Sequence, residues 1–120
     1  MLPAWRQNRT PLAVLINTFA MTIILTAIDN RLFNAWQSEC GQFDFVEVVH
    51  GSILDVSTDA VVSPANSFGF MDGGIDALYT RKFGTGVQSR LQEAIREFHF
   101  GELLVGASEI VETEDAKIPF

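Results

Sequence analysis

Cysteine is nearly absent from this chain of 120 residues, since Cys40 is the only one. A single thiol cannot form a disulfide within the chain, and no cysteine pair has the spacing of a zinc site. The two histidines, His50 and His99, lie far apart in the sequence and have no cysteine nearby. We therefore expect neither a bound metal nor a cofactor, and we expect the reducing environment of the cytoplasm.

Basic residues are also few. The chain has 8 Lys and Arg against 15 Asp and Glu, which gives a formal net charge of −7. An acidic surface repels a long polyanion, so double-stranded nucleic acid is not expected as a partner. A small anion remains compatible with this charge, because backbone N–H groups bind phosphate without any Lys or Arg.

A convincing membrane span is missing as well. Residues 12–28 carry no charge, but Asn17, Thr18, Thr22 and Thr26 interrupt the run, and a span needs about 20 predominantly apolar residues. We interpret 21–28 as a buried strand and residues 1–20 as an extension of unknown role, and we expect no membrane association.

Hydrophobic residues are plentiful, at 48% with ten Phe, so a packed core and a single domain over 21–120 are expected. Hydrophobic periodicity, capping residues and glycines predict alternating elements. The expected strands are 21–28, 45–49, 60–63 and 102–111, and the expected helices are 30–39, 75–82 and 87–98. Such alternation predicts an α/β layered fold with a mixed, largely parallel sheet.

Two of these helices have a predicted apolar face. In the helix at 30–39, Leu32 and Trp36 follow helical spacing and are expected on one side. The helix at 87–98 carries a longer apolar stripe, which consists of Val87, Leu91, Ala94, Ile95 and Phe98.

The loop at 64–76 carries the strongest functional signal. Gly73 and Gly74 directly precede a predicted helix, so the backbone there can approach a ligand without a Cβ in the way. The first-turn N–H groups of a helix lack internal partners, and the helix dipole adds partial positive charge. Asn66, at a strand end, has an amide that suits ribose hydroxyls, and Asp76 falls in the first helical turn.

Each of these residues also has a plain structural interpretation. A Gly-Gly pair is often only a turn, Asn66 can cap a loop, and Asp76 can simply complement the helix dipole. The G-x-G-x-x-G spacing of dinucleotide-binding proteins is absent.

Taken together, the residues resemble the macro domain family. Val-Val-Ser-Pro-Ala-Asn-Ser at 61–67 and Gly-Gly-Ile-Asp at 73–76 are similar to the family's first ligand loop. Gly-Ser-Ile at 51–53 with Asp-Ala-Val-Val at 59–62 is similar to the segment that precedes this loop in the family. The resemblance covers roughly residues 45–120 and implies a three-layer α/β/α sandwich that binds ADP-ribose, its protein conjugates or related nucleotides.

The resemblance implies ligand contacts for Ser52, Ile53, Asn66, Gly73, Gly74, Ile75 and Asp76. If the chain is an ADP-ribosyl hydrolase, Asp76 and Asn66 are the catalytic candidates, because the family's active members use an aspartate near the distal ribose to position water. Three alternatives thus stay open: a binding module for ADP-ribose or another nucleotide, such a hydrolase, or a ligand-free fragment that acts through self-association.

The chain departs from the family pattern at three places. Ser52 replaces the aspartate that reads adenine, and Ser63 replaces the first asparagine of the usual pair. The second phosphate loop would lie after Phe120. We therefore expect an incomplete domain, which a second copy of the chain can complete as a homo-oligomer.

Overall fold

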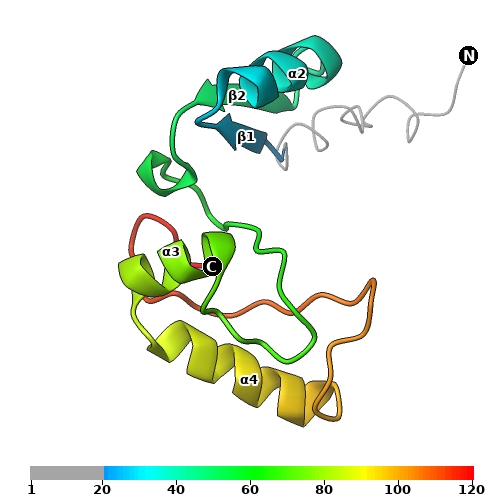
Figure 1. The fold of residues 1–120 in the computed structure, drawn as a ribbon, viewed down its shortest axis with the longest axis vertical. Helices are drawn as coiled ribbons and strands as arrows, with labels where there is room; N and C mark the ends of the chain where they lie inside the picture. The colour runs from blue at the N-terminus through cyan, green and yellow to red at the C-terminus, as the bar shows by residue number, and fades with distance from the viewer. Residues whose placement is uncertain (1–20) are drawn as a thin grey trace, which may run out of the picture. The chain divides into compact units, whose positions relative to one another are not determined.

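The computed structural model describes residues 21–120, and the extension expected at 1–20 lies outside the described residues. The chain divides into two compact units, one ending at Ser52 and the other spanning Ile53–Phe120. The boundary falls inside the stretch expected to be one domain. The fold is mixed α/β, with a small parallel sheet in the first unit and two helices in the second (Figure 1).

The described part of the first unit is a strand–helix–strand motif. Strand β1 (Ile23–Ala27) and strand β2 (Val46–His50) are parallel and joined through helix α2 (Asn30–Cys40), which lies beside them (Figure 1). Their register pairs Ile23 with Val46 and Ala27 with His50. The parallel pairing follows from the crossover, because two parallel strands cannot be joined by a tight hairpin.

Both ends of α2 follow from its sequence. The carboxylate of Asp29 accepts the N–H groups of Arg31 and Leu32 at 2.9 and 3.1 Å, which makes Asp29 the N-cap; by sequence both Asp29 and Asn30 suit that position. At the other end the N–H of Gly41 donates to the carbonyl of Gln37 at 3.2 Å. Helix α2 and the flanking strands β1 and β2 confirm the elements predicted at 30–39, 21–28 and 45–49.

The predicted apolar face of α2 is partly wrong. Leu32 is 46% exposed, whereas Phe33 is half-buried and stacks on His50 with ring centroids 4.8 Å apart. Phe33 and Trp36 are three positions apart and share a helix face as readily as Leu32 and Trp36 do. The aromatic contact with β2 favours Phe33, and periodicity alone did not identify it.

The second unit is built on two helices, α3 (Gly74–Phe83) and α4 (Gly86–Phe98), preceded by a short 3-10 turn, η3 (Ile53–Asp55). Gly84, with φ of 85°, breaks the helical path between them. Their facing sides enclose one apolar core, which consists of Met71, Tyr79, Val87, Leu91, Ile95 and Leu103. Both predicted helices are confirmed.

The predicted stripe of α4 is confirmed except at its end. Val87, Leu91 and Ile95 are buried, but Phe98 is 64% exposed. Just after Phe98 the backbone reverses through positive φ angles at Phe100 and Gly101. The stripe therefore runs past the part of the helix that has neighbours to pack against.

The strands predicted at 60–63 and 102–111 do not form, which is a correction to the expected sheet. Around Ala60 the N–H of Val61 donates to Phe120 and the N–H of Phe120 donates to Asp59, as in a parallel ladder, but this pairing involves a single residue of each segment. Residues 102–111 are interrupted by a turn, in which Gly106 has φ of 88°. A strand requires a paired neighbour along its length, and both segments lack one in the described chain.

Among residues 21–120, no helix is long and apolar enough to cross a membrane.

Candidate functional site

The N-terminus of α3 has the glycine geometry that the sequence predicts. Gly73 is the N-cap in an extended conformation with φ of −132°, and Gly74 has φ of 56°. A Cβ at either position would meet no atom within 4 Å. No side chain caps this helix. The first-turn N–H groups therefore have no side-chain acceptor, and the exposed backbone at Gly73 and Gly74 leaves an anion room to approach the start of the helix.

Asn66 organises the loop that leads to these glycines. Its side-chain oxygen accepts the N–H groups of Phe68 and Phe70, both at 3.1 Å, and its amide donates to the carbonyl of Phe70 at 2.6 Å. In this structure the amide is thus engaged within its own loop. Asn66 therefore caps its own loop, which is one of the two interpretations that the sequence allowed.

Gly69, in the same loop, is packed against α4. Its φ is 72°, and a Cβ built there would lie 3.0 Å from Ile95 Cδ1 and 3.2 Å from Leu91 Cγ. Only glycine combines this backbone conformation with this close approach. The path of the 66–70 loop is therefore fixed on one side by Asn66 and on the other by α4.

Asp76 is buried, with only 6% of its surface exposed. The hydroxyl of Ser63 donates a hydrogen bond to Asp76 Oδ1. Ser63 thus supplies a donor to the carboxylate that the sequence singled out. Sequence reasoning noted Ser63 only as a departure and missed it as the partner of Asp76.

Tyr79 lies one helical turn after Asp76 and is 2% exposed. Its hydroxyl donates to the carbonyl of Val62 at 3.1 Å. Burial raises the pKa of the Tyr79 phenol above its ordinary value of 10.0, and the nearby carboxylate of Asp76 raises it further. The phenol therefore acts as a neutral hydrogen-bond donor that fastens residue 62 to α3.

Two polar side chains hold the backbone just before the glycines. The N–H of Met71 donates to Gln88 Oε1 at 2.7 Å, and the hydroxyl of Thr80 donates to the carbonyl of Met71 at 2.8 Å. Thr80 and Gln88 were not predicted as part of the site. The sequence indicates them only by their positions on the two helices that follow the loop.

The other predicted contact residues lie in different surroundings. Ile75 and Ile53 are half-buried and pack against the apolar core of the second unit. Ser52 is the last residue of the first unit, whereas the remaining candidates belong to the second. The structure therefore gathers Asn66, Gly73, Gly74, Ile75 and Asp76 on one continuous loop and helix start.

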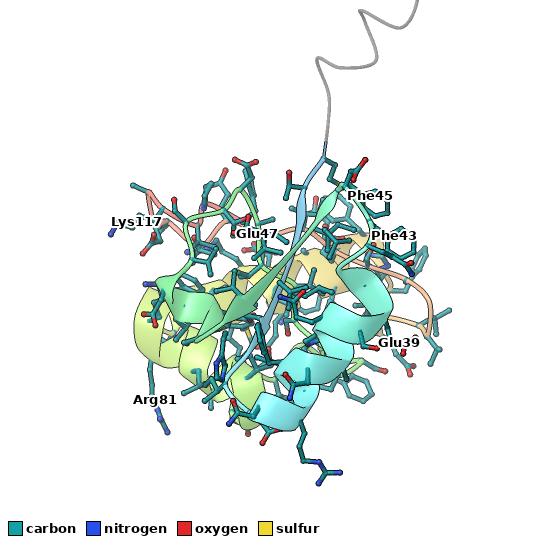
Figure 2. All side chains as sticks on the ribbon, turned by 90° about the horizontal axis from the view of Figure 1, so that it is seen from above. Glu39, Phe43, Phe45, Glu47, Arg81 and Lys117 are labelled. Carbon is teal, nitrogen blue, oxygen red and sulfur yellow. The ribbon has the colours of Figure 1, made fainter. Side chains whose placement is uncertain are left out.

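The charges around the glycines are negative. Asp72 is exposed directly before Gly73, whereas the cationic residues of α3, Arg81 and Lys82, lie in its last turn. Arg81 projects away from the helix in Figure 2. An anion at Gly73 and Gly74 would thus be held by backbone N–H groups and the helix dipole. Within residues 21–120 no group of three acidic, histidine or cysteine side chains is placed to hold a metal ion.

No family model matches the chain, and no solved structure matches it. An uncharacterized protein of Aquifex aeolicus (strain VF5) is 40% identical to this chain over 48 residues, which is 40% of this chain and 29% of that protein. The chain thus aligns with less than a third of that relative, and the similarity carries no activity with it.

Proposed function

We propose that this chain binds ADP-ribose, free or attached to a protein, or a closely related nucleotide, through the loop from Asn66 to Asp76. The observation that carries the proposal is the start of α3, where no side chain caps the first-turn N–H groups and Gly73 and Gly74 are exposed. A diphosphate placed there gains hydrogen bonds from the backbone and favourable interaction with the helix dipole.

The resemblance to the macro domain family supplies the identity of the ligand. Gly-Gly-Ile-Asp at 73–76, together with Asn66, resembles the first ligand loop of that family. On this proposal the domain is a three-layer α/β/α sandwich. The strand–helix–strand motif and the two helices after the loop are compatible with part of it.

Binding is favoured over hydrolysis by the surroundings of Asp76. A general base must reach a water molecule next to the substrate. Asp76 is 6% exposed and one of its oxygens already accepts the Ser63 hydroxyl. Asn66, the other catalytic candidate, is engaged by its own loop. We therefore propose a binding module.

Titration calorimetry of the full chain with ADP-ribose, ADP and AMP tests the proposal. We expect ADP-ribose to bind more tightly than ADP, and AMP to bind weakest, because the pyrophosphate and the distal ribose both lie at the loop. A folded chain that releases no heat with ADP-ribose would refute the proposed function.

Two matched pairs of variants locate the ligand. Gly73→Ala adds a methyl group at an extended position with open space around it, so the fold is retained and ADP-ribose binding is weakened. Ser89→Ala, at an exposed position of α4, leaves affinity unchanged. Asp72→Asn removes a negative charge beside the glycines and tightens binding at low salt, whereas Glu97→Gln near the end of α4 does not.

A further inference from the structure

The second unit contains a cavity of about 500 Å³ that the proposed function does not use. Its walls are core-facing side chains of α3 and α4 together with the extended segments 60–65 and 107–111. The volume lies within the range of about 300–1,000 Å³ that small-molecule sites occupy. Of the loop from Asn66 to Asp76 only Met71 lines it, and neither Gly73 nor Gly74 does, so the cavity borders the loop without including the anion-binding glycines.

The lining of the cavity is mainly apolar and aromatic. Tyr79, Phe83, Val87 and Leu91 contribute from the two helices. Val62 and Ile110 also line it, yet they are 85% and 76% exposed, so they mark its opening to solvent. A ligand that covers these two side chains would remove apolar surface from water, which is favourable in proportion to the area covered.

The polar groups in the walls are already bonded within the protein. Ser63 donates to Asp76, and the Tyr79 hydroxyl donates to the carbonyl of Val62. Glu109 accepts from His99 at 2.8 Å and from the N–H of Ile110 at 3.0 Å. Thr113 donates to the carbonyl of Ile118.

Among the hydroxyl and carboxylate side chains that line the cavity, only Ser108 makes no hydrogen bond to residues 21–120. A charged ligand placed in this cavity would lose its hydration without gaining a counter-charge, and that loss is costly. A neutral ligand with one hydrogen-bonding group would meet the apolar walls and leave a single hydroxyl to bond.

We propose that the cavity is a binding site for a neutral, largely apolar small molecule. Contact with the aromatic and aliphatic walls supplies the affinity, and the Ser108 hydroxyl supplies one hydrogen bond. This site is additional to the nucleotide loop, and occupation of one does not require occupation of the other.

Fluorescence titration of the full chain with N-phenyl-1-naphthylamine, a neutral apolar probe with one N–H, tests the proposal. We expect saturable binding at a single site. Ala107→Trp fills part of the cavity and weakens binding about tenfold or more. Ala116→Trp, an exposed position that does not line the cavity, leaves the affinity unchanged.

The absence of saturable binding, or equal affinity of folded Ala107→Trp and Ala116→Trp, would overturn the proposal. An anionic naphthalene sulfonate of similar size that bound as tightly as the neutral probe would also overturn it. If Ala107→Trp fails to fold, methyl resonances of Val87 and Leu91 in the unmodified chain provide the test. They shift on addition of the probe if the cavity binds it, and perturbations confined to other residues contradict the site.

Added ADP-ribose does not displace the probe if the two sites are independent. Displacement would contradict that independence. Because this titration needs no nucleotide, a failure of the proposed function and a failure of the cavity proposal remain distinguishable.

Discussion

The hydroxyl of Ser63 donates a hydrogen bond to the carboxylate of Asp76, and this bond joins the extended segment before the loop to the first turn of α3. A second bond, from the Tyr79 hydroxyl to the carbonyl of Val62, lies one turn further along the helix. Asp76 and Tyr79 are three residues apart and therefore share a helix face. These two bonds anchor the N-terminal end of the 64–74 loop on the helix into which its C-terminal end continues.

Ser63→Ala should destabilise the chain by about 1–3 kcal/mol, because it leaves a buried carboxylate without its donor. Chemical denaturation measures the change. Ser89→Ala, which removes a hydroxyl from an exposed position of α4, should cost less than about 0.5 kcal/mol. Equal effects of the two substitutions would show that the Ser63 bond contributes little.

Stability should fall at alkaline pH through Tyr79. The folded-state pKa of the phenol is raised above 10.0, so the folded chain holds this proton more tightly than the unfolded chain. The contribution is fully present below pH 10 and is lost as pH rises through the folded pKa. Tyr79→Phe should remove this loss, which denaturation at several alkaline pH values would detect.

Tyr79 also offers a direct spectroscopic test, because it is the single tyrosine of the chain. The ultraviolet absorbance of tyrosinate should appear above pH 10 in the folded chain and near its ordinary pH in denaturant. Asp76→Asn removes a nearby negative charge and should lower the midpoint. Identical titrations of folded and denatured chains would contradict the buried phenol.

Stability should also fall at acidic pH through Glu109. The hydrogen bond from His99 lowers the pKa of the Glu109 carboxyl below its ordinary value of 4.5, and the N–H of Ile110 adds to the effect. The contribution is present above pH 4.5 and is lost as pH falls through the folded pKa. Glu109→Gln should destabilise the chain by about 1 kcal/mol at neutral pH.

That destabilisation should disappear well below pH 4.5, where Glu109 of the parent chain is protonated and is uncharged like the Gln that replaces it. Denaturation of both chains at neutral and acidic pH gives the comparison. Glu97→Gln, at an exposed position of α4, serves as the charge-matched control. A constant difference between Glu109→Gln and the parent chain across this range would contradict the explanation by hydrogen bonds to the Glu109 carboxylate.

The two glycines of the loop should respond differently to alanine. Gly74 has φ of 56°, a left-handed conformation that costs a residue with a Cβ about 1–2 kcal/mol. Gly73 is extended, so Gly73→Ala should change stability by less than about 0.5 kcal/mol. Thermal melting of both variants tests the contrast, and equal melting temperatures would contradict the assigned backbone conformation.

Local signals in the sequence predicted the helices well. Asp29 before α2 and Gly84 between α3 and α4 supply the required caps and breaks, so each helix was recognised from a few neighbouring residues. The apolar stripe of α4 also identified Val87, Leu91 and Ile95 as core. These features depend on periodicity and capping, which involve only residues that are close together in the sequence.

The strands predicted at 60–63 and 102–111 were wrong, because local signals are less reliable for strands than for helices. Their β-branched residues favour extended backbone, but a ladder depends on a partner elsewhere in the chain. The Ser63–Asp76 and His99–Glu109 contacts likewise join residues that are distant in sequence. The glycine loop itself was predicted, whereas the bonds that anchor it were not.

The packing of Gly69 against α4 has a consequence for how this loop can change. Asn66 and Gly69 determine the backbone path, while the side chains between and beside them, Phe68 and Phe70, remain 55% and 52% exposed. The residues that set the shape are therefore separate from the residues that face outward. Substitution at 68 and 70 can alter what the loop recognises while its frame stays constant, so this segment is well suited to evolving new specificity.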